Sequence, residues 1–230
     1  PSQPLPTRAC LLQEKLKITQ NSLAFDVNQG CSGFIYALSL ASSLIKSNCA
    51  SRIIIICADH YSKYISVNDR TSRPIFSDAA AAVIIENSEQ NNIGPFVFKT
   101  KGSGGDFLTV NKLNKKFNLY MDGPAVLKFS LGLVPEATSE LLESSGLEIS
   151  QIDNFIFHQA SAVVLNKLQK KLNIPNGKWF NRLENIGNTV SATIPIAINI
   201  LQKEKKFLQS YKHLMMGFGV GLSVAGCIIS

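Results

Sequence analysis

Charged side chains are scarce in this chain of 230 residues: Asp, Glu, Lys and Arg together make up 17%, and the net charge is 23 − 16 = +7. Hydrophobic residues make up 45%, so the chain can bury a sizeable core and is not a disordered tail. The 15 Gly and nine Pro are near ordinary usage, which excludes collagen and low-complexity sequence. The length suits one large domain or two small ones.

Cysteine is also scarce, and no two cysteines form a C-x-x-C pair. An odd, scattered set argues against a disulfide framework and against a zinc site. The same set fits a reducing compartment, so we expect a cytoplasmic protein that holds no metal. The five residues are Cys10, Cys31, Cys49, Cys57 and Cys227.

Long apolar runs are missing as well. The first ten residues, PSQPLPTRAC, lack the basic region and apolar stretch of an export signal. Two uncharged stretches, Val27–Ile45 and Leu214–Ser230, are interrupted by polar residues or by glycines, so neither resembles a transmembrane helix. We expect both to be buried on all sides, in a chain that does not enter a membrane.

The hydrophobic pattern predicts helices and strands in an order that repeats. Each series has a helix, a strand, an uncharged helix and two strands. Thr7 is expected to cap the first helix, and the apolar run Ile53–Cys57 predicts a strand buried on both faces. The first series covers helix 7–16, strand 23–27, helix 31–46 and strands 53–57 and 80–85; the second covers helix 162–172, strand 178–180, helix 191–205 and strands 214–216 and 223–229.

This repeat predicts an α/β protein of two duplicated halves, residues 1–92 and 93–230. Each half is expected to hold a mostly parallel sheet that ends in an antiparallel strand. The second half has an extra strand at 93–100, a helix at 126–142 and a strand at 155–157, which have no counterpart in the first. We therefore expect a truncated first half, whose β-α-β piece is absent or belongs to another chain.

Cys31 is the first candidate for a chemical role. It follows the predicted strand in LAFDVNQG and opens the buried helix, and open α/β folds bind ligands at such turns. A helix N-terminus lowers the pKa of a thiol and favours the reactive thiolate. Gly30 and Gly33 allow backbone and substrate to approach closely. The alternative is a buried structural cysteine, which is the interpretation we adopt for the other four.

Only three histidines are available as partners for a thiolate. His158, in FHQAS, ends a predicted strand and precedes a helix, at the same type of sheet edge as Cys31. His60 also follows a strand, whereas His213 lies near lysines and is expected to face solvent. Asn188, in ENIGNTVSATIP, occupies the place in the second series that Cys31 occupies in the first, although a role as N-cap would also explain it.

The glycine-rich stretch GFGVG, Gly217–Gly221, joins the last two predicted strands. Backbone N–H groups there can point at a bound oxygen, as an oxyanion hole requires. A tight hairpin turn is the alternative explanation. The stretch is not a dinucleotide-binding fingerprint, because the third glycine is misplaced and no helix follows.

Six stretches together resemble the β-ketoacyl-[acyl-carrier-protein] synthase III family of condensing enzymes, in the thiolase superfamily. They fall in family order and span nearly the whole chain: AFDVNQGCSGF, DRTSRPIFSDAAAAVII, MDGPAVLKF, FHQAS, IGNTVSATIPIAI and GFGVGL. The resemblance implies a thiolase-like fold whose two halves are layered as α/β/α/β/α. It also implies that an N-terminal stretch is absent, in agreement with the truncated first half.

The resemblance further implies roles for individual residues. Cys31 is the nucleophile that takes the acyl group from acyl-CoA. His158 and Asn188 hold the thioester carbonyl of malonyl-acyl carrier protein while CO2 is lost. Acyl-CoA is a substrate, and no metal or permanently bound cofactor is needed. The backbone N–H groups of a second oxyanion hole are those of Cys31, Gly219, Val220 and Gly221.

Other positions are implied for binding. Arg70 and Gly123 fall where the family contacts CoA, although Arg70 is equally well explained as a surface or subunit contact. The family docks its carrier protein on the helix after FHQAS, but its usual basic residue is Val163 here, and FSDAA replaces FGDGA. The expected carrier-docking residues are Gln159, Ala160, Ser161, Val163 and Lys167.

These implications favour an enzyme that initiates fatty-acid synthesis by condensing acyl-CoA with malonyl-acyl carrier protein. The positive net charge fits an acidic carrier protein, and the absence of a binding motif argues against nucleic acid. The family usually forms homodimers. Two alternatives stay open: a related condensing or acyl-transfer enzyme of specialised metabolism, and a non-catalytic, truncated chain that acts as a binding partner.

Overall fold

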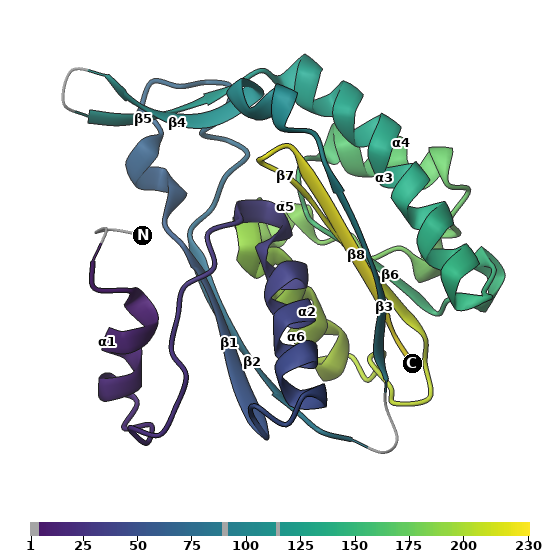
Figure 1. Ribbon diagram of the computed structural model, residues 1–230. Coiled ribbons are helices and arrows are strands. Elements are labelled where there is room, and N and C mark those ends of the chain that lie inside the picture. The colour runs from purple at the N-terminus through teal and green to yellow at the C-terminus, as the bar shows by residue number, and fades with distance from the viewer. Residues whose placement is uncertain (1–4, 89–91, 114–115) are drawn as a thin grey trace.

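The computed structural model describes residues 5–88, 92–113 and 116–230 and arranges them in layers (Figure 1). A two-stranded sheet on one side is followed by helices α2 (Gly33–Lys46) and α6 (Thr193–Lys203), and then by a four-stranded sheet. The far face of the larger sheet is covered by α3 (Gly123–Ser145) and α4 (Ala162–Lys171). The two sheets therefore share one helical layer between them.

Helix α2 lies at the centre because its sequence, GFIYALSLASSLIK, is apolar on nearly every side. Phe34, Ile35 and Leu38 are at most 1% exposed, and the helix contacts strands of both sheets. A helix between two sheets has to be apolar on opposite sides, and this agrees with the buried helix expected at 31–46. Leu40 is an exception, because it is 43% exposed.

The two-stranded sheet is an antiparallel hairpin of β1 (Arg52–Asp59) and β2 (Ala79–Glu86). One face, which includes Ile55 and Cys57, packs against the central helices. The opposite face is accessible, and Ile54 and Ile56 are 40% and 36% exposed. We expected the strand that is now β1 to be buried on both faces. The described part of the chain covers only one face of β1, so this expectation is wrong.

The four-stranded sheet has the order β3-β8-β7-β6. Only β6 and β7 are parallel, so the expectation of a mostly parallel sheet is wrong, although its final strand is antiparallel as expected. Residues 178–180 contribute a single bridge between Trp179 and Phe155 rather than a full strand. The four strands are β3 (Ile93–Thr100), β6 (Asn154–Phe157), β7 (His213–Gly219) and β8 (Ser223–Ile229).

Helix α3 starts and stops at local sequence signals. The Asp122 carboxylate accepts a hydrogen bond of 2.9 Å from the Ala125 N–H, and Pro124 lies in the first turn, where no N–H is needed. Gly146 ends the helix in the left-handed conformation, with a φ of 62°. Because α3 packs against β3, β7 and β8, it covers most of one face of the larger sheet.

The segment before Cys31 differs from its expected structure. Helix α1 (Arg8–Lys15) forms, but Thr7 makes no side-chain cap. The Asp26 carboxylate instead accepts 2.8 Å hydrogen bonds from the N–H groups of Arg8 and Ala9. Residues 23–27, expected to be a strand, pair with no strand among the described residues, and Figure 1 shows them as an extended trace between α1 and α2.

Shorter elements complete the described chain, and two of them, η1 and η6, flank the candidate site. No helix in the described ranges is long and apolar enough to cross a membrane. The shorter elements are β4 (Leu108–Leu113), β5 (Lys116–Met121), α5 (Leu183–Ile186) and the 3-10 helices η1 (Gly30–Ser32), η2 (Tyr61–Tyr64), η3 (Gly102–Phe107), η4 (Ile149–Gln151), η5 (Asn176–Lys178) and η6 (Val190–Ala192).

Leu38 and Leu40 allow a matched test of the shared helical layer. We expect Leu38→Ala to lower the free energy of unfolding by about 2–5 kcal/mol, because it leaves a cavity at a fully packed position. The same change at the exposed Leu40 is expected to cost less than about 1 kcal/mol. Urea denaturation followed by circular dichroism measures both values. Equal losses would contradict the burial of α2 between the sheets.

Candidate active site

Cys31 lies in η1, the turn that leads into α2, and is 3% exposed. The preceding Gly30 adopts a φ of 57°, which allows the chain to turn sharply into the helix. A Cβ on Gly30 would lie 2.3 Å from Val220 Cγ1, so a larger residue does not fit there. The sulfur is therefore held at the N-terminal end of a buried helix.

The connection between β7 and β8 packs directly on this sulfur. A Cβ on Gly219 would lie 3.0 Å from Cys31 Cβ and 3.1 Å from Cys31 Sγ, so the glycine backbone touches the thiol. The backbone of Val220 and the backbone of Cys31 itself make hydrogen bonds to the thiol. Gly221, by contrast, has Ser223 as its nearest neighbour. Of the four predicted oxyanion-hole residues, Cys31, Gly219 and Val220 thus meet at the sulfur.

Burial raises the pKa of the Cys31 thiol from 9.0 to about 12. Loss of solvent is the largest cause; the Val220 backbone hydrogen bond opposes it, and the Asp59 carboxylate adds to it. Loss of solvent thus opposes the thiolate that we expected at the helix N-terminus. A nucleophilic role requires that the thiol lose its proton once a substrate is bound.

His158 directly follows β6 and is 1% exposed. Its backbone N–H donates to the Met216 carbonyl at 2.8 Å, and its ring packs edge-on against Phe218, with 5.5 Å between the ring centres. Nδ1 lies 2.8 Å from Thr193 Oγ1. Burial lowers the pKa of the imidazole to about 3, so the ring is neutral near pH 7.

Asn188 lies in the turn between α5 and η6 and is 4% exposed. Its Oδ1 accepts a hydrogen bond of 3.0 Å from the Val190 N–H, and its Nδ2 donates to the Ala160 carbonyl at 3.1 Å. The first of these resembles the N-cap bond that the sequence allows. Both bonds fix the orientation of the amide and leave its second N–H available to a ligand.

The backbone of Val190 joins His158 to Asn188. Its N–H holds the amide oxygen of Asn188, and its carbonyl is hydrogen-bonded to the His158 ring. The Thr193 hydroxyl, 2.8 Å from Nδ1 of His158, also lies 3.1 Å from the Val190 carbonyl. The two side chains that the sequence assigns to one substrate oxygen are thus positioned by the same short turn.

A second set of contacts ties this turn to the first half. Ser191 donates its N–H, at 3.1 Å, and its hydroxyl to the Asp59 carboxylate at the end of β1. A Cβ on Gly33, two residues after Cys31, would lie 3.7 Å from Ser191 Cβ, and η6 contacts η1. The structure therefore brings the elements that carry the three predicted side chains together at one place.

Tyr61 is a neighbour of this site that the sequence did not reveal. It begins η2, and its ring stacks on Phe76 with 5.3 Å between the ring centres. Its hydroxyl oxygen would lie 3.8 Å from a Cβ on Gly30. Burial raises the pKa of the phenol, and the nearby Cys31 adds to the rise. An aromatic residue after a strand has no distinctive pattern, so no sequence signal could have found it.

His60, the second histidine considered as a partner, is directed elsewhere. Its Nε2 lies 3.4 Å from Asp78 Oδ2, and its side chain is 66% exposed. Among the described residues, no three His, Cys, Asp or Glu side chains gather in a way that could hold a metal ion.

The predicted CoA contacts are Arg70, in the connection between η2 and β2, and Gly123, the first residue of α3. Arg70 is exposed, and nothing lies within 4 Å of a Cβ placed on the half-buried Gly123. The strand β5, which ends just before Gly123, contacts η2, which precedes Arg70 along the chain. Both positions are accessible, and their role in CoA binding stays a prediction.

The predicted docking residues differ in accessibility. Val163 is 56% exposed on α4, and Lys167, one turn later, is also exposed. Ser161 caps the helix, with its hydroxyl accepting from the Val164 N–H at 3.4 Å, and Ala160 is half-buried. These residues leave a partly apolar, partly basic helix face open to a partner.

Gln159 cannot be the docking contact that the sequence assigns to it, because it is 0% exposed. Its Nε2 donates to the Phe157 carbonyl at 2.8 Å, and its Oε1 accepts from the Arg182 N–H at 3.1 Å. These bonds make Gln159 a support of the turn between β6 and α4.

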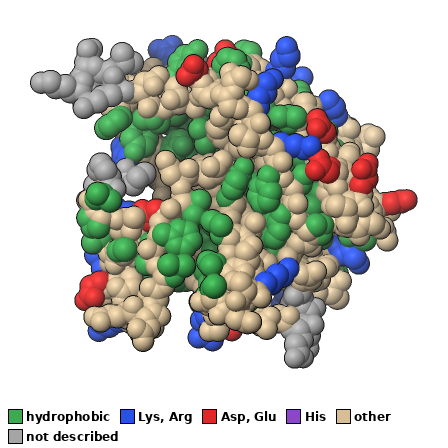
Figure 2. Space-filling model, viewed as in Figure 1, with side chains coloured by type: hydrophobic (Ala, Val, Ile, Leu, Met, Phe, Trp, Pro, Cys, Tyr) green, Lys and Arg blue, Asp and Glu red, His purple; other side chains and the backbone are tan. Residues whose placement is uncertain are grey.

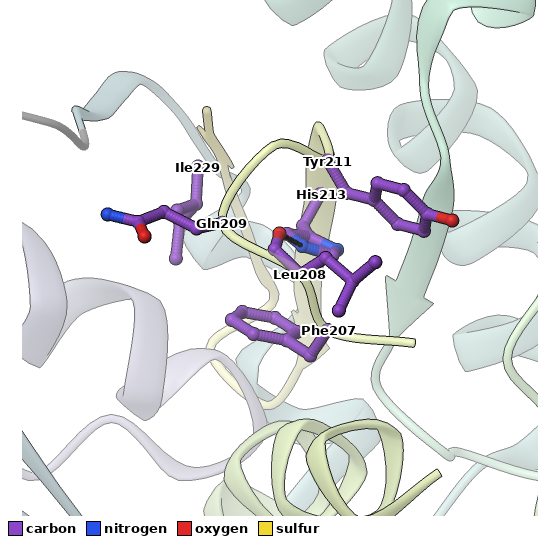
Figure 3. Close-up of a pocket in the computed structure, with 6 residues that line it drawn as sticks. All are labelled: Phe207, Leu208, Gln209, Tyr211, His213 and Ile229. Atoms are coloured by element: carbon purple, nitrogen blue, oxygen red, sulfur yellow. Dashed lines mark hydrogen bonds between the residues drawn. The ribbon is translucent and has the colours of Figure 1, made fainter. Parts of the chain in front are cut away.

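A cavity of about 360 Å³ lies far from this site, where β7 begins and β8 ends (Figure 3). His213 lines it and is 1% exposed, so the expectation that it faces solvent is wrong. Its ring stacks on Phe207 with 3.9 Å between the ring centres, and its two nitrogens contact Asn154 Nδ2 and the Leu208 carbonyl. His213 thus has partners for both nitrogens and is a structural residue. Cys31 lies at the opposite end of β7, against Gly219.

Comparisons with known proteins agree with the resemblance seen in the motifs. Residues 25–102 match the family model of 3-oxoacyl-[acyl-carrier-protein] synthase III, and residues 142–230 match the model of its C-terminal part. A β-ketoacyl-[acyl-carrier-protein] synthase III from Clostridium perfringens is 36% identical over 97% of this chain and 72% of its own length.

Two crystal structures are similar over the whole chain. A 3-oxoacyl-(acyl-carrier-protein) synthase III is 38% identical with a TM-score of 0.92, and this chain covers 75% of it. The corresponding enzyme from Aquifex aeolicus is 34% identical with a TM-score of 0.94, and this chain covers 73% of it. Both matches cover 100% of this chain, so the layered arrangement of Figure 1 is that of these proteins.

The raised pKa of Cys31 predicts how its reactivity depends on pH. Only the thiolate is alkylated, so a pKa near 12 means that the rate rises about tenfold per pH unit from about pH 7 to 10. Iodoacetamide labelling followed by peptide mass mapping measures this rate. A variant with the exposed Cys10 and Cys49 changed to Ser removes the two accessible competitors. A rate that levels off below about pH 8 would mean that the helix N-terminus stabilises the thiolate after all.

Proposed function

The chain belongs to the 3-oxoacyl-[acyl-carrier-protein] synthase III family, and we propose that Cys31 is the residue through which it transfers the acyl group. It is an acyltransferase of thiolase-like fold that condenses an acyl group from acyl-CoA with malonyl-acyl carrier protein in fatty-acid biosynthesis. The observation that carries the residue assignment is the contact of the Gly219 and Val220 backbone with the buried sulfur of Cys31.

The first half-reaction forms an acyl-enzyme. The thiol of Cys31 loses its proton, the sulfur attacks the thioester carbon of acyl-CoA, and the bond from that carbon to the CoA sulfur breaks. CoA leaves as a free thiol after taking up a proton. The negative charge of the tetrahedral intermediate lies on the carbonyl oxygen, and the N–H groups of Cys31 and Val220 stabilise it there.

The second half-reaction joins two carbon units. In malonyl-acyl carrier protein the bond between the carboxylate carbon and C2 breaks, CO2 leaves, and the electron pair forms an enolate. C2 then attacks the acyl carbon on Cys31, and the bond to sulfur breaks. The product is a β-ketoacyl carrier protein, and the sulfur takes up a proton to restore the thiol.

His158 and Asn188 stabilise the enolate oxygen in this scheme. Asn188 donates the second N–H of its amide, which has no partner among the residues that the structure describes. His158 donates from Nε2 when its proton is on that nitrogen; Nδ1 then accepts from the Thr193 hydroxyl, which turns from the Val190 carbonyl to the ring. A neutral, buried imidazole fits a hydrogen-bond donor. Each donor is worth about 10²–10³ in rate, as in other oxyanion holes.

The binding partners are assigned to the surface around this centre. We propose that CoA lies along Arg70 and Gly123, and that the carrier protein docks on the α4 face that carries Ser161, Val163 and Lys167. The positive net charge favours encounter with an acidic carrier. A homodimer and a cytoplasmic location are proposed on the family resemblance and the cysteine content.

Cys31→Ala is expected to abolish formation of the acyl-enzyme. After incubation with acetyl-CoA, the unchanged chain gains the mass of one acetyl group, and peptide mapping places it on Cys31. The variant gains none, because its methyl side chain cannot form a thioester. Cys57→Ala is the control, since it removes another buried thiol and keeps Cys31. A full mass gain in Cys31→Ala would refute the assignment.

Thr193→Val tests how the His158 ring is positioned. Valine keeps the shape of the side chain but cannot form a hydrogen bond with Nδ1, so we expect CO2 release from malonyl-acyl carrier protein to fall about 10- to 100-fold, the effect of a lost hydrogen bond worth about 1–3 kcal/mol. Thr193→Ser keeps the hydroxyl and should retain most of the rate. Acylation of Cys31 should be nearly unchanged in both variants. Equal loss in both variants, or equal loss of acylation, would contradict this role.

A further inference from the structure

The turns η1 and η6 begin with the same backbone conformation. Gly30 opens η1 with a φ of 57°, and Val190 opens η6 with a φ of 56°. Each turn continues directly into a central helix, α2 or α6. The second residue of each turn ends in a thiol or a hydroxyl, Cys31 in η1 and Ser191 in η6. Ser191, and not Asn188 as the repeat in the sequence predicted, therefore occupies the place of Cys31 in the second half.

The strands that these two turns contact correspond as well. Turn η1 packs on β7 and turn η6 packs on β1, so each turn meets a strand of the other half. Cys31 touches Gly219, the last residue of β7, whereas Ser191 is bonded to Asp59, the last residue of β1. The equivalent places differ in one respect, because the thiol faces a glycine backbone and the hydroxyl faces a carboxylate.

Val190 needs a support that Gly30 does not. A left-handed φ is open to glycine, but a β-branched residue rarely adopts it. The residue after Val190 is held by two hydrogen bonds to the Asp59 carboxylate, one from the Ser191 N–H at 3.1 Å and one from the Ser191 hydroxyl. Asp59 therefore anchors the turn in a conformation that its own sequence disfavours.

The carboxylate of Asp59 also lies where charges are uncommon. Figure 2 shows most charged side chains towards the margins of its view, with hydrophobic side chains nearer the centre. Asp59 is half-buried, and its negative charge adds to the loss of solvent that raises the pKa of the Cys31 thiol. A charged group beside a buried thiol is typical of a functional site. The other titratable groups near Asp59 are Cys57, His60, Tyr61 and Asp78.

We propose that Asp59 is a positioning residue for the reaction at Cys31. Through Ser191 it holds turn η6 beside the sulfur, and the backbone of that turn holds the amide of Asn188 and the ring of His158. The inference rests on the proposed function, because it requires that these two side chains act on a substrate held at Cys31. The negative charge of Asp59 also disfavours the thiolate, so its charge and its hydrogen bonds have separate effects.

Three substitutions separate the hydrogen bonds of Asp59 from its charge. Asp59→Asn removes the charge but keeps an oxygen that accepts from Ser191. Ser191→Ala keeps the charge and removes the hydroxyl bond. Asp59→Ala removes both the charge and the bonds. Circular dichroism verifies that each variant folds.

Hydrogen exchange of the Val190 amide, whose N–H donates to Asn188, measures the positioning role without catalysis. We expect this exchange to be at least about tenfold faster in Asp59→Ala, because the turn loses its anchor, and nearly unchanged in Asp59→Asn. Ser191→Ala should lie between them. The amides of helix α3 are the internal control and should exchange as in the unchanged chain. CO2 release from malonyl-acyl carrier protein should fall at least about tenfold in Asp59→Ala and less than about threefold in Asp59→Asn.

Iodoacetamide labelling of Cys31 measures the effect of the charge. Asp59→Asn should raise the labelling rate about 3- to 10-fold at a given pH below 10, because a nearby negative charge no longer opposes the thiolate. Ser191→Ala keeps the charge and should leave the rate nearly unchanged. Asp78→Asn is the matched control, since its carboxylate lines the same shallow cavity as Asp59 but is bonded to Ser62. Its labelling rate should equal that of the unchanged chain.

Three results would each overturn the proposal. They are an unchanged exchange rate of the Val190 amide in Asp59→Ala, an equal acceleration at Val190 and throughout α3, and equal labelling rates in Asp59→Asn and Asp78→Asn. An acyl group that maps to a cysteine other than Cys31 would instead refute the proposed function, and it would leave the exchange and labelling results as they are.

Discussion

The backbone of Val190 makes the contacts on which the proposed active site depends. Its N–H fixes the amide of Asn188 and its carbonyl contacts the ring of His158, so the backbone of one residue positions both side chains. The adjoining Ser191 is bound to Asp59 at the end of β1. Backbone hydrogen bonds of this kind hold groups in place before substrate arrives, which is how an enclosed site gains electrostatic stabilisation of a developing charge.

Burial determines the chemistry that these groups can perform. Loss of solvent keeps both the Cys31 thiol and the His158 ring uncharged in the free protein. Burial therefore opposes a thiolate–imidazolium pair in the free protein, and the proposed reaction places negative charge on a substrate oxygen. Backbone and side-chain N–H groups are the appropriate partners for that charge, because they need no change in their own protonation.

Local sequence signals predicted most of the fold and the candidate residues. Cys31 and His158 were identified because each follows a predicted strand and precedes a helix, and a side chain at such a turn reaches the sheet edge. Features that depend on distant partners were not predictable. The strand expected at 23–27 does not form in the described chain, and the burial of Gln159 and His213 results from tertiary hydrogen bonds that no local pattern encodes.

A crystal structure of the chain acylated at Cys31, with a malonyl thioester analogue that cannot lose CO2, is the most direct test of the central claim. The account predicts that Nε2 of His158 and Nδ2 of Asn188 both lie about 3 Å from the thioester oxygen of the analogue. The acyl carbon on Cys31 should face C2 of the analogue. An acyl group on a different cysteine, or an imidazole or amide directed away from that oxygen, would contradict the account.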